Sequence, residues 1–265
     1  MTWGPTAFGG GSFVDGRGSV DVVDRPSAVE FMREALVKIS EEDIGTVIEL
    51  LARKRNDLAP FLTDDALAAG NADVVRPILA RMFAVRRRSD ELLVAVGAPA
   101  LAAAIRDLLH GAGRVEARFH AFDEALAGVE APVRRDLAGE CLHFLDPERH
   151  WLWSRWMWDP DTMTGSLPLV MVEEFEFSGP DAGAVYLRVG AATSSVIATA
   201  RELGFQRMGS SPFAVDVYLA AIYGVYLYTV TRLRMTQEFN RVIPPLPDLV
   251  RRLLGVKRLD GQREW

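Results

Sequence analysis

The residues whose types and spacing could bind a metal lie on two neighbouring predicted helices. Glu140 and His143 are three residues apart, so their side chains project from adjacent positions of one helix. Glu116 and His120 are four residues apart on the preceding helix. Because a short turn joins the two helices, we expect an antiparallel pair in which these carboxylates and imidazoles could converge on a divalent metal. A metal-dependent enzyme with a site between helices 114–127 and 131–145 is therefore one functional hypothesis.

The helical phase of the same side chains argues against that site. Glu116 and His120 lie about a quarter-turn or more from the centre of the apolar stripe of their helix, at roughly 100° per residue. His143 is displaced in the same way from the apolar stripe that includes Leu137 and Cys141. The phase predicts a solvated flank with ion pairs. A carboxylate-bridged di-iron site would also need a second Glu-x-x-His element, which the chain lacks.

Tryptophans are concentrated in one short segment, because four of the six fall within residues 151–158. They could form a core plug between two helical layers, line an aromatic pocket for a small molecule, or form a protein-binding surface. Tryptophan, arginine and methionine are enriched where proteins bind each other. Our functional hypothesis takes the binding surface, made by Arg149, Trp151, Trp153, Arg155, Trp156 and Trp158.

Motifs for nucleophilic catalysis are missing. The chain has no Gly-x-Ser-x-Gly sequence, and its single cysteine, Cys141, lies between apolar neighbours on a predicted helix. A net charge of −6 argues against binding to nucleic acid. We therefore expect a non-catalytic accessory or scaffold protein that binds a protein partner or a second copy of itself. Whether the chain is an enzyme, and which cofactor it would use, stays open.

The elements that must position these residues are mainly helices. The pattern predicts a multi-helix globular domain built around a long apolar helix, with at most a small extended element or β-hairpin near residues 167–177. We divide the chain into a Gly-rich arm (1–25), a helical half (26–146), a Trp-rich junction (147–178) and a second helical half with a Pro-rich elbow (179–265). Ser40 and Asp43 form a capping-box pattern, and the helix through Val75 and Val85 is expected to end at residues 86–88.

The apolar helix allows a third hypothesis, that residues 213–233 attach the protein to a membrane. Asp216 lies one turn from the start of this helix, where a charge is costly in lipid. A buried helix fits better, and Asp216 must then pair, with an arginine such as Arg155 or Arg188 as the partner. The N-terminus lacks the pattern of a secretory signal, so we expect a cytoplasmic protein.

Overall fold

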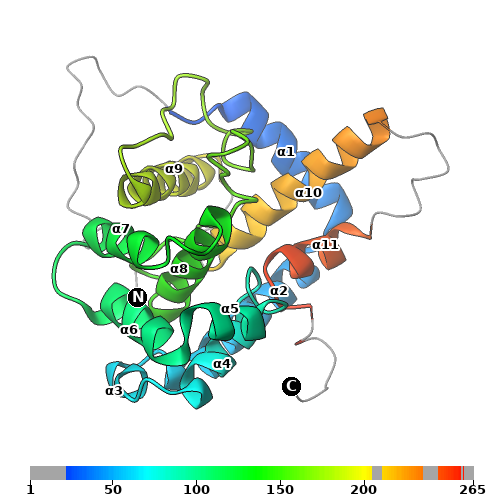
Figure 1. Cartoon of the computed structure of the whole chain (residues 1–265). Coiled ribbons are helices and arrows are strands. Elements are labelled where there is room, and N and C mark those ends of the chain that lie inside the picture. The colour runs from blue at the N-terminus through cyan, green and yellow to red at the C-terminus, as the bar shows by residue number, and fades with distance from the viewer. Residues whose placement is uncertain (1–21, 205–210, 235–243, 258, 260–265) are drawn as a thin grey trace.

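A computed structural model shows a mainly α protein (Figure 1). It describes residues 22–204, 211–234, 244–257 and 259. Within these ranges the helices are α1 (Arg25–Lys38), α2 (Glu41–Leu58), the 3-10 turn η1 (Ala59–Phe61), α3 (Asp64–Ala68), α4 (Ala72–Arg81), α5 (Ser89–Val96), α6 (Ala98–His110), α7 (Val115–Ala125), α8 (Ala131–Leu145), α9 (Ala182–Glu202), α10 (Ala214–Arg234) and α11 (Leu246–Leu253). The predicted fold class is confirmed.

Local sequence signals explain where most of these helices begin. Ser40 accepts a hydrogen bond from the backbone N–H of Asp43, and the Asp43 carboxylate accepts one from the N–H of Ser40, which completes the predicted capping box of α2. Asp181 caps α9 in a similar way by accepting from Ala184. Pro132 lies in the first turn of α8, where its fixed φ angle favours the helix.

The central helix of the fold is α8. Figure 1 shows α8 with α7 and α9 on one side and α10 and α11 on the other. The helices α3 to α6 lie below it in this view, and α2 and α6 pack against it. Every residue from 136 to 144 is buried, the charged ones included. By contrast, α10 is mostly buried only from residue 214 to residue 225, and its later described residues are partly exposed. The structure therefore does not show the expected long apolar helix at the centre of the fold.

The region near residues 167–177 consists of turns and irregular backbone with one isolated bridge at Met171, within the expectation of at most a small extended element. Within the described ranges the backbone pairing outside helices is limited to two isolated bridges, Val23 with Met171 and Asp159 with Thr164. The N-terminal arm falls mostly outside the described residues, as does the chain between α10 and the prolines of the elbow. Helices from both predicted halves share one continuous hydrophobic core, with α1 and α2 packed on α10 and α7 packed on α9.

The helix predicted to run on to residues 86–88 ends earlier. Met82 follows α4 with extended backbone, and turns connect it to α5, which the sequence pattern did not predict. The arginines at 86–88 therefore lie in a turn. This break leaves the backbone N–H groups of Phe83 and Ala84 outside any helix, where a side chain can bind them.

The described helices contain no single segment with both the length and the hydropathy of a membrane span; α5 and α6 reach that standard only as a pair, and they are bent by 97°.

Candidate functional site

Three polar side chains of α8 face the interior along one line of the helix. Asp136, Glu140 and His143 are spaced four and three residues apart, so they lie on the same face. Each is at least 95 % buried. The sequence pattern had predicted a solvated flank for Glu140 and His143, which is wrong. Glu140 and His143 are instead covered by other helices, which supply partners of opposite charge.

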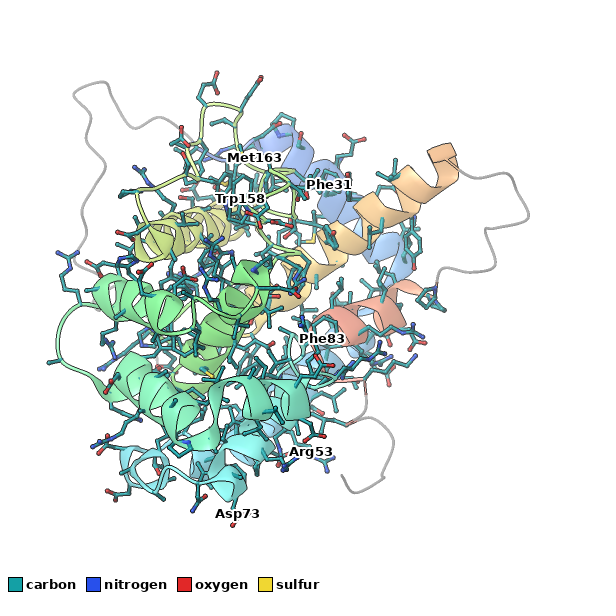
Figure 2. The ribbon with its side chains drawn as sticks, in the orientation of Figure 1. Phe31, Arg53, Asp73, Phe83, Trp158 and Met163 are labelled. Atoms are coloured by element: carbon teal, nitrogen blue, oxygen red, sulfur yellow. The ribbon has the colours of Figure 1, made fainter. Side chains whose placement is uncertain are left out.

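Glu140 lies in a closed network. Its carboxylate accepts a hydrogen bond from Lys54 Nζ at 2.8 Å, and from the backbone N–H groups of Phe83 and Ala84 at 3.2 and 3.3 Å. The Lys54 ammonium also lies 4.2 Å from the centre of the Phe144 ring. Lys54 Nζ also donates to the carbonyl oxygen of Leu254 at 3.5 Å. These five contacts hold a buried carboxylate and a buried ammonium in fixed positions, as burial of charge requires. Figure 2 shows Phe83 beside the end of α11.

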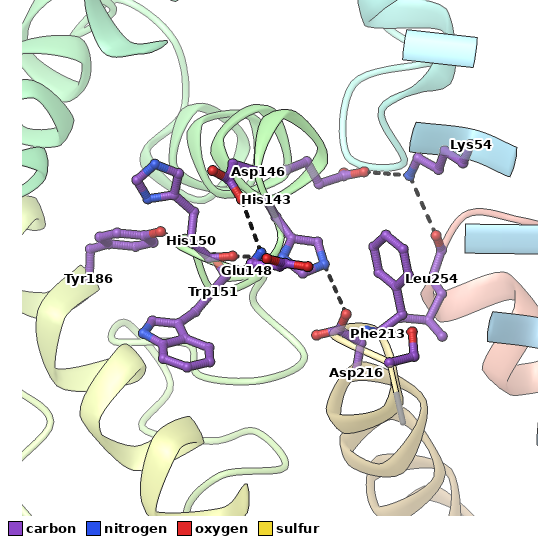
Figure 3. A network of polar contacts seen from close by, with 12 residues as sticks. Lys54, His143, Asp146, Glu148, His150, Trp151, Tyr186, Phe213, Asp216 and Leu254 are labelled. Carbon is purple, nitrogen blue, oxygen red and sulfur yellow. Dashed lines mark hydrogen bonds and ion pairs between the residues drawn. The ribbon is translucent and has the colours of Figure 1, made fainter. Parts of the chain in front are cut away.

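His143 lies in a second closed network (Figure 3). Its Nε2 is 2.9 Å from a carboxylate oxygen of Asp216, in the first turn of α10, and its Nδ1 is 2.8 Å from the carbonyl oxygen of His150. Because that carbonyl can only accept, Nδ1 carries a proton. Burial is the largest influence on the pKa of His143 and lowers it, but the charge and hydrogen bond of Asp216 and the hydrogen bond to the His150 carbonyl together outweigh burial, so that the pKa of His143 is raised above its usual value. The predicted arginine partner of Asp216 is thus replaced by a histidine.

Asp136 differs because the side chain of its cationic partner is partly exposed to solvent. Its two oxygens accept hydrogen bonds from the backbone N–H and from Nε of Arg155, each at 2.8 Å. Burial raises the pKa of Asp136, the Arg155 charge lowers it in part, and the net value is about 6. A carboxyl group with this pKa can take up or release a proton near neutral pH.

A cavity of about 250 Å³ lies against Asp136 and Glu140. Most of its walls are apolar side chains from α8, the turn after α4, the Trp-rich segment and the end of α11; they are Phe83, Ala84, Phe144, Leu152, Trp156, Leu253 and Leu254. Ser154 and Arg155 complete the lining. The Ser154 side chain is buried, and within the described ranges its Oγ has no hydrogen-bond partner.

Arg155 supplies the free positive edge of this cavity. Within the described part of the chain, its hydrogen bonds use the backbone N and Nε, which leaves both Nη groups for solvent or a ligand. The side chain is 45 % exposed, whereas that of Asp136 is only 7 % exposed. The cavity therefore combines an apolar body with a guanidinium, a buried carboxyl group and a hydroxyl, which is the usual composition of a small-molecule site.

The structure does not bring the four candidate metal ligands together. Glu140 is bound to Lys54 and His143 to Asp216, while Glu116 pairs with Arg114 on the surface. His120 is half-buried on α7, apart from both networks. Among the described residues, no group of three or more histidine, cysteine, aspartate or glutamate side chains is arranged to hold a metal ion.

Three of the four clustered tryptophans pack inside the chain. Trp153 stacks on Phe119 at 5.4 Å between ring centres, and Trp158 stacks on Phe177 at 4.4 Å. Trp156 is also buried and lines the cavity. Gly139 on α8 permits this packing, because a Cβ at that position would lie 2.3 Å from the carbonyl oxygen of Trp153. The buried rings are therefore covered by this chain, as in the core-plug interpretation.

The rest of the segment remains accessible to other molecules. Arg149 and Arg155 are exposed, and Trp151 is half-buried beside α9, where its ring fills the space left by Gly190.

The sequence signals did not identify Asp136 or Lys54 as site residues. A buried lysine leaves no local pattern, since its partner Glu140 lies 86 residues away.

Comparison with other proteins gives no functional assignment: no family model matches the chain, and no curated protein or solved structure gives a significant match.

Proposed function

We propose that this chain is a helical protein that binds a small organic molecule in the cavity between α8, the turn after α4, the 152–156 segment and the end of α11. The observation that carries the proposal is an apolar cavity of about 250 Å³ whose lining holds the Arg155 guanidinium and the Ser154 hydroxyl. Among the residues that the structure describes, the Nη groups of Arg155 and the Ser154 hydroxyl have no hydrogen-bond partner. A cavity of about 150 Å³ is already large enough for a benzene molecule, so this one has room for a ring with a polar substituent.

Blocking the cavity tests the proposal. Ala84 lines it, and its backbone N–H, which binds Glu140, does not depend on the side chain. Ala84→Leu should therefore fill space without breaking the Glu140 network. A library of single-ring fragments would be screened against the full chain by ligand-observed NMR. We expect fragments that bind the wild type to lose at least tenfold in affinity with Ala84→Leu.

Val94→Leu provides the matched control, because Val94 is 88 % exposed on α5 and does not line the cavity. It should bind the same fragments as the wild type. Fragments that bind Ala84→Leu as tightly as the wild type would place their site elsewhere and contradict the proposal, as would a screen in which no fragment binds.

Binding to a protein partner remains a second candidate. The observation that favours it is the exposure of Arg149 and Arg155 together with the half-buried Trp151 in one short segment. Trp153, Trp156 and Trp158 would reach a partner only after the core opened. The proposal of a partner or of self-association therefore rests on the outer side of the segment alone, and the cytoplasmic location likewise stays a prediction.

A further inference from the structure

The charges around the cavity limit the kind of ligand that it can bind. The lining contains two carboxylates, Asp136 and Glu140, and one guanidinium, that of Arg155. Lys54 stands behind Glu140 and is bound to it. Each carboxylate thus already has a cation, whereas the Nη groups of Arg155 have no partner within the described part of the chain. A positively charged ligand would meet Arg155 without finding a free carboxylate.

A ligand with a negative group suits the free edge of Arg155, because a guanidinium can donate two parallel hydrogen bonds to a carboxylate. The two carboxylates on α8 set a limit on that charge. A phosphate carries up to two negative charges near neutral pH and would be repelled more strongly than a carboxylate with one. The apolar walls formed by Phe144, Trp156 and Leu254 suit a ring or a short hydrocarbon beside the charged group.

Binding of a negative group at Arg155 also affects Asp136. The negative group of the ligand and the Asp136 carboxylate would both contact the Arg155 guanidinium. A like charge so close disfavours the ionised form of a buried carboxyl group. Among the described residues, the charged groups that face Asp136 are Arg155, which opposes its protonation, and Glu140 on the same helix, which favours it. The sides of the cavity formed by the turn after α4 and by α11 contribute Phe83, Ala84, Leu253 and Leu254, which carry no side-chain charge.

We propose that the ligand carries a carboxylate on an apolar body, that the Nη edge of Arg155 binds this carboxylate, and that Asp136 takes up one proton when the ligand binds. The protonated carboxyl group of Asp136 then becomes a hydrogen-bond donor toward the ligand. Because Asp136 has a pKa of about 6 in the free protein, it is mostly ionised at pH 7.5, and each binding event there takes a proton from solution. This inference rests on the proposed ligand-binding function.

Four probes that share one aromatic ring separate the possibilities: benzoate, phenyl phosphate, benzyl alcohol and benzylamine. Isothermal titration calorimetry of the full chain with each probe gives affinities between about pH 6 and about pH 8. We expect benzoate to bind most tightly. Its affinity should fall with rising pH and approach about tenfold per pH unit well above the pKa of Asp136. Titrations in two buffers with different ionisation enthalpies should show close to one proton taken up per benzoate at pH 7.5.

Two substitutions assign the residues. Arg155→Gln removes the guanidinium and should weaken benzoate at least tenfold, and more than it weakens benzyl alcohol. Asp136→Asn removes the titrating group and should abolish proton uptake, with folding checked by circular dichroism. If Asp136→Asn does not fold, the proton uptake of the wild type still decides this part of the inference.

The outcomes distinguish this inference from the function on which it rests. Tighter binding of benzyl alcohol or benzylamine than of benzoate would overturn the carboxylate preference while leaving a ligand cavity. Phenyl phosphate binding more tightly than benzoate would replace the carboxylate with a phosphate. Benzoate binding without proton uptake would overturn the role of Asp136. If none of the four probes binds and the fragment screen is also empty, the proposed function fails together with the inference.

Discussion

The polar face of α8 contains two kinds of buried charge. Glu140 and His143 are enclosed: each faces one partner of opposite charge from a distant helix, and backbone groups provide their other contacts. Asp136 is equally buried and lines the cavity as Glu140 does, but its partner Arg155 is about half exposed. The two enclosed pairs fix how α2, α8 and α10 pack together. The open pair has a cation that can still bind something else.

This difference indicates which charges stabilise the fold and which could serve a ligand. A buried ion pair contributes little over a well-packed apolar pair, but removal of one partner is costly because the other charge stays uncompensated. Substitutions in the enclosed pairs should therefore lower the free energy of unfolding by several kcal/mol, whereas substitutions on the exposed side of the same region should change it little.

The largest effect is expected when Lys54 is replaced. Lys54→Met keeps most of the side-chain volume but leaves the Glu140 carboxylate buried with only two backbone donors. We expect a loss of about 3–5 kcal/mol in the free energy of unfolding, measured by urea denaturation at pH 7. The double variant Lys54→Met/Glu140→Gln should be more stable than Lys54→Met, since no uncompensated charge remains.

Lys38→Met provides the control for this substitution. Lys38 pairs with Glu34 on the surface of α1, four residues away, and such pairs contribute up to about 0.5 kcal/mol. Equal losses for Lys54→Met and Lys38→Met would show that the enclosed pair is no more important to stability than a surface pair.

A smaller, pH-dependent effect is expected for the second enclosed pair. Asp216 raises the pKa of His143, so the charged pair stabilises the fold fully below the ordinary histidine pKa, and this contribution is lost as pH rises through the higher pKa of the folded state. In Asp216→Asn, only the hydrogen bond to the His150 carbonyl still opposes burial, so protonation of His143 is disfavoured. We expect the variant to lose about 2–4 kcal/mol near pH 5.5 and clearly less near pH 8.5.

Unfolding curves at several pH values would measure this difference. Asp248→Asn is a suitable control, because Asp248 is a partly exposed carboxylate that pairs with Lys257 instead of a histidine. A stability difference between wild type and Asp216→Asn that stays constant from about pH 5.5 to about pH 8.5 would contradict the charged His143–Asp216 pair.

The sequence predicts the helices of this fold better than the contacts of its polar residues. The expected bounds of 131–145 agree with α8, because a proline near the start and an apolar repeat are local signals. The same apolar repeat placed Glu140 and His143 on a solvated flank. It could not show that Lys54 and Asp216 approach α8 from distant parts of the chain. Charged residues on a helix therefore indicate exposure only when no distant partner covers them.

The end of α4 illustrates the same limit. The arginines at 86–88 resemble the end of a helix by charge, but α4 stops at Arg81. The backbone groups freed by this break bind Glu140, a residue of another helix. A break that is stabilised by a tertiary contact has no signal in its own sequence.

The tryptophans gave a clear sequence signal, because their crowding marked an important region. Crowding alone does not distinguish rings that pack inside the chain from rings that face a partner.

The smallest effect is expected at Arg149, on the outer side of the Trp-rich segment. Its side chain is 71 % exposed and its guanidinium lies 3.5 Å from Asp146, so the pair is screened by water and Arg149→Ala should change the free energy of unfolding by no more than about 0.5 kcal/mol. Urea denaturation measures this value, and sedimentation velocity of the same variant tests whether the segment mediates self-association. A stable Arg149→Ala that dissociates a wild-type dimer would support that hypothesis. A loss above about 1 kcal/mol would mean instead that the exposed side of the segment also stabilises the fold, and the contrast between its buried and exposed sides would no longer hold.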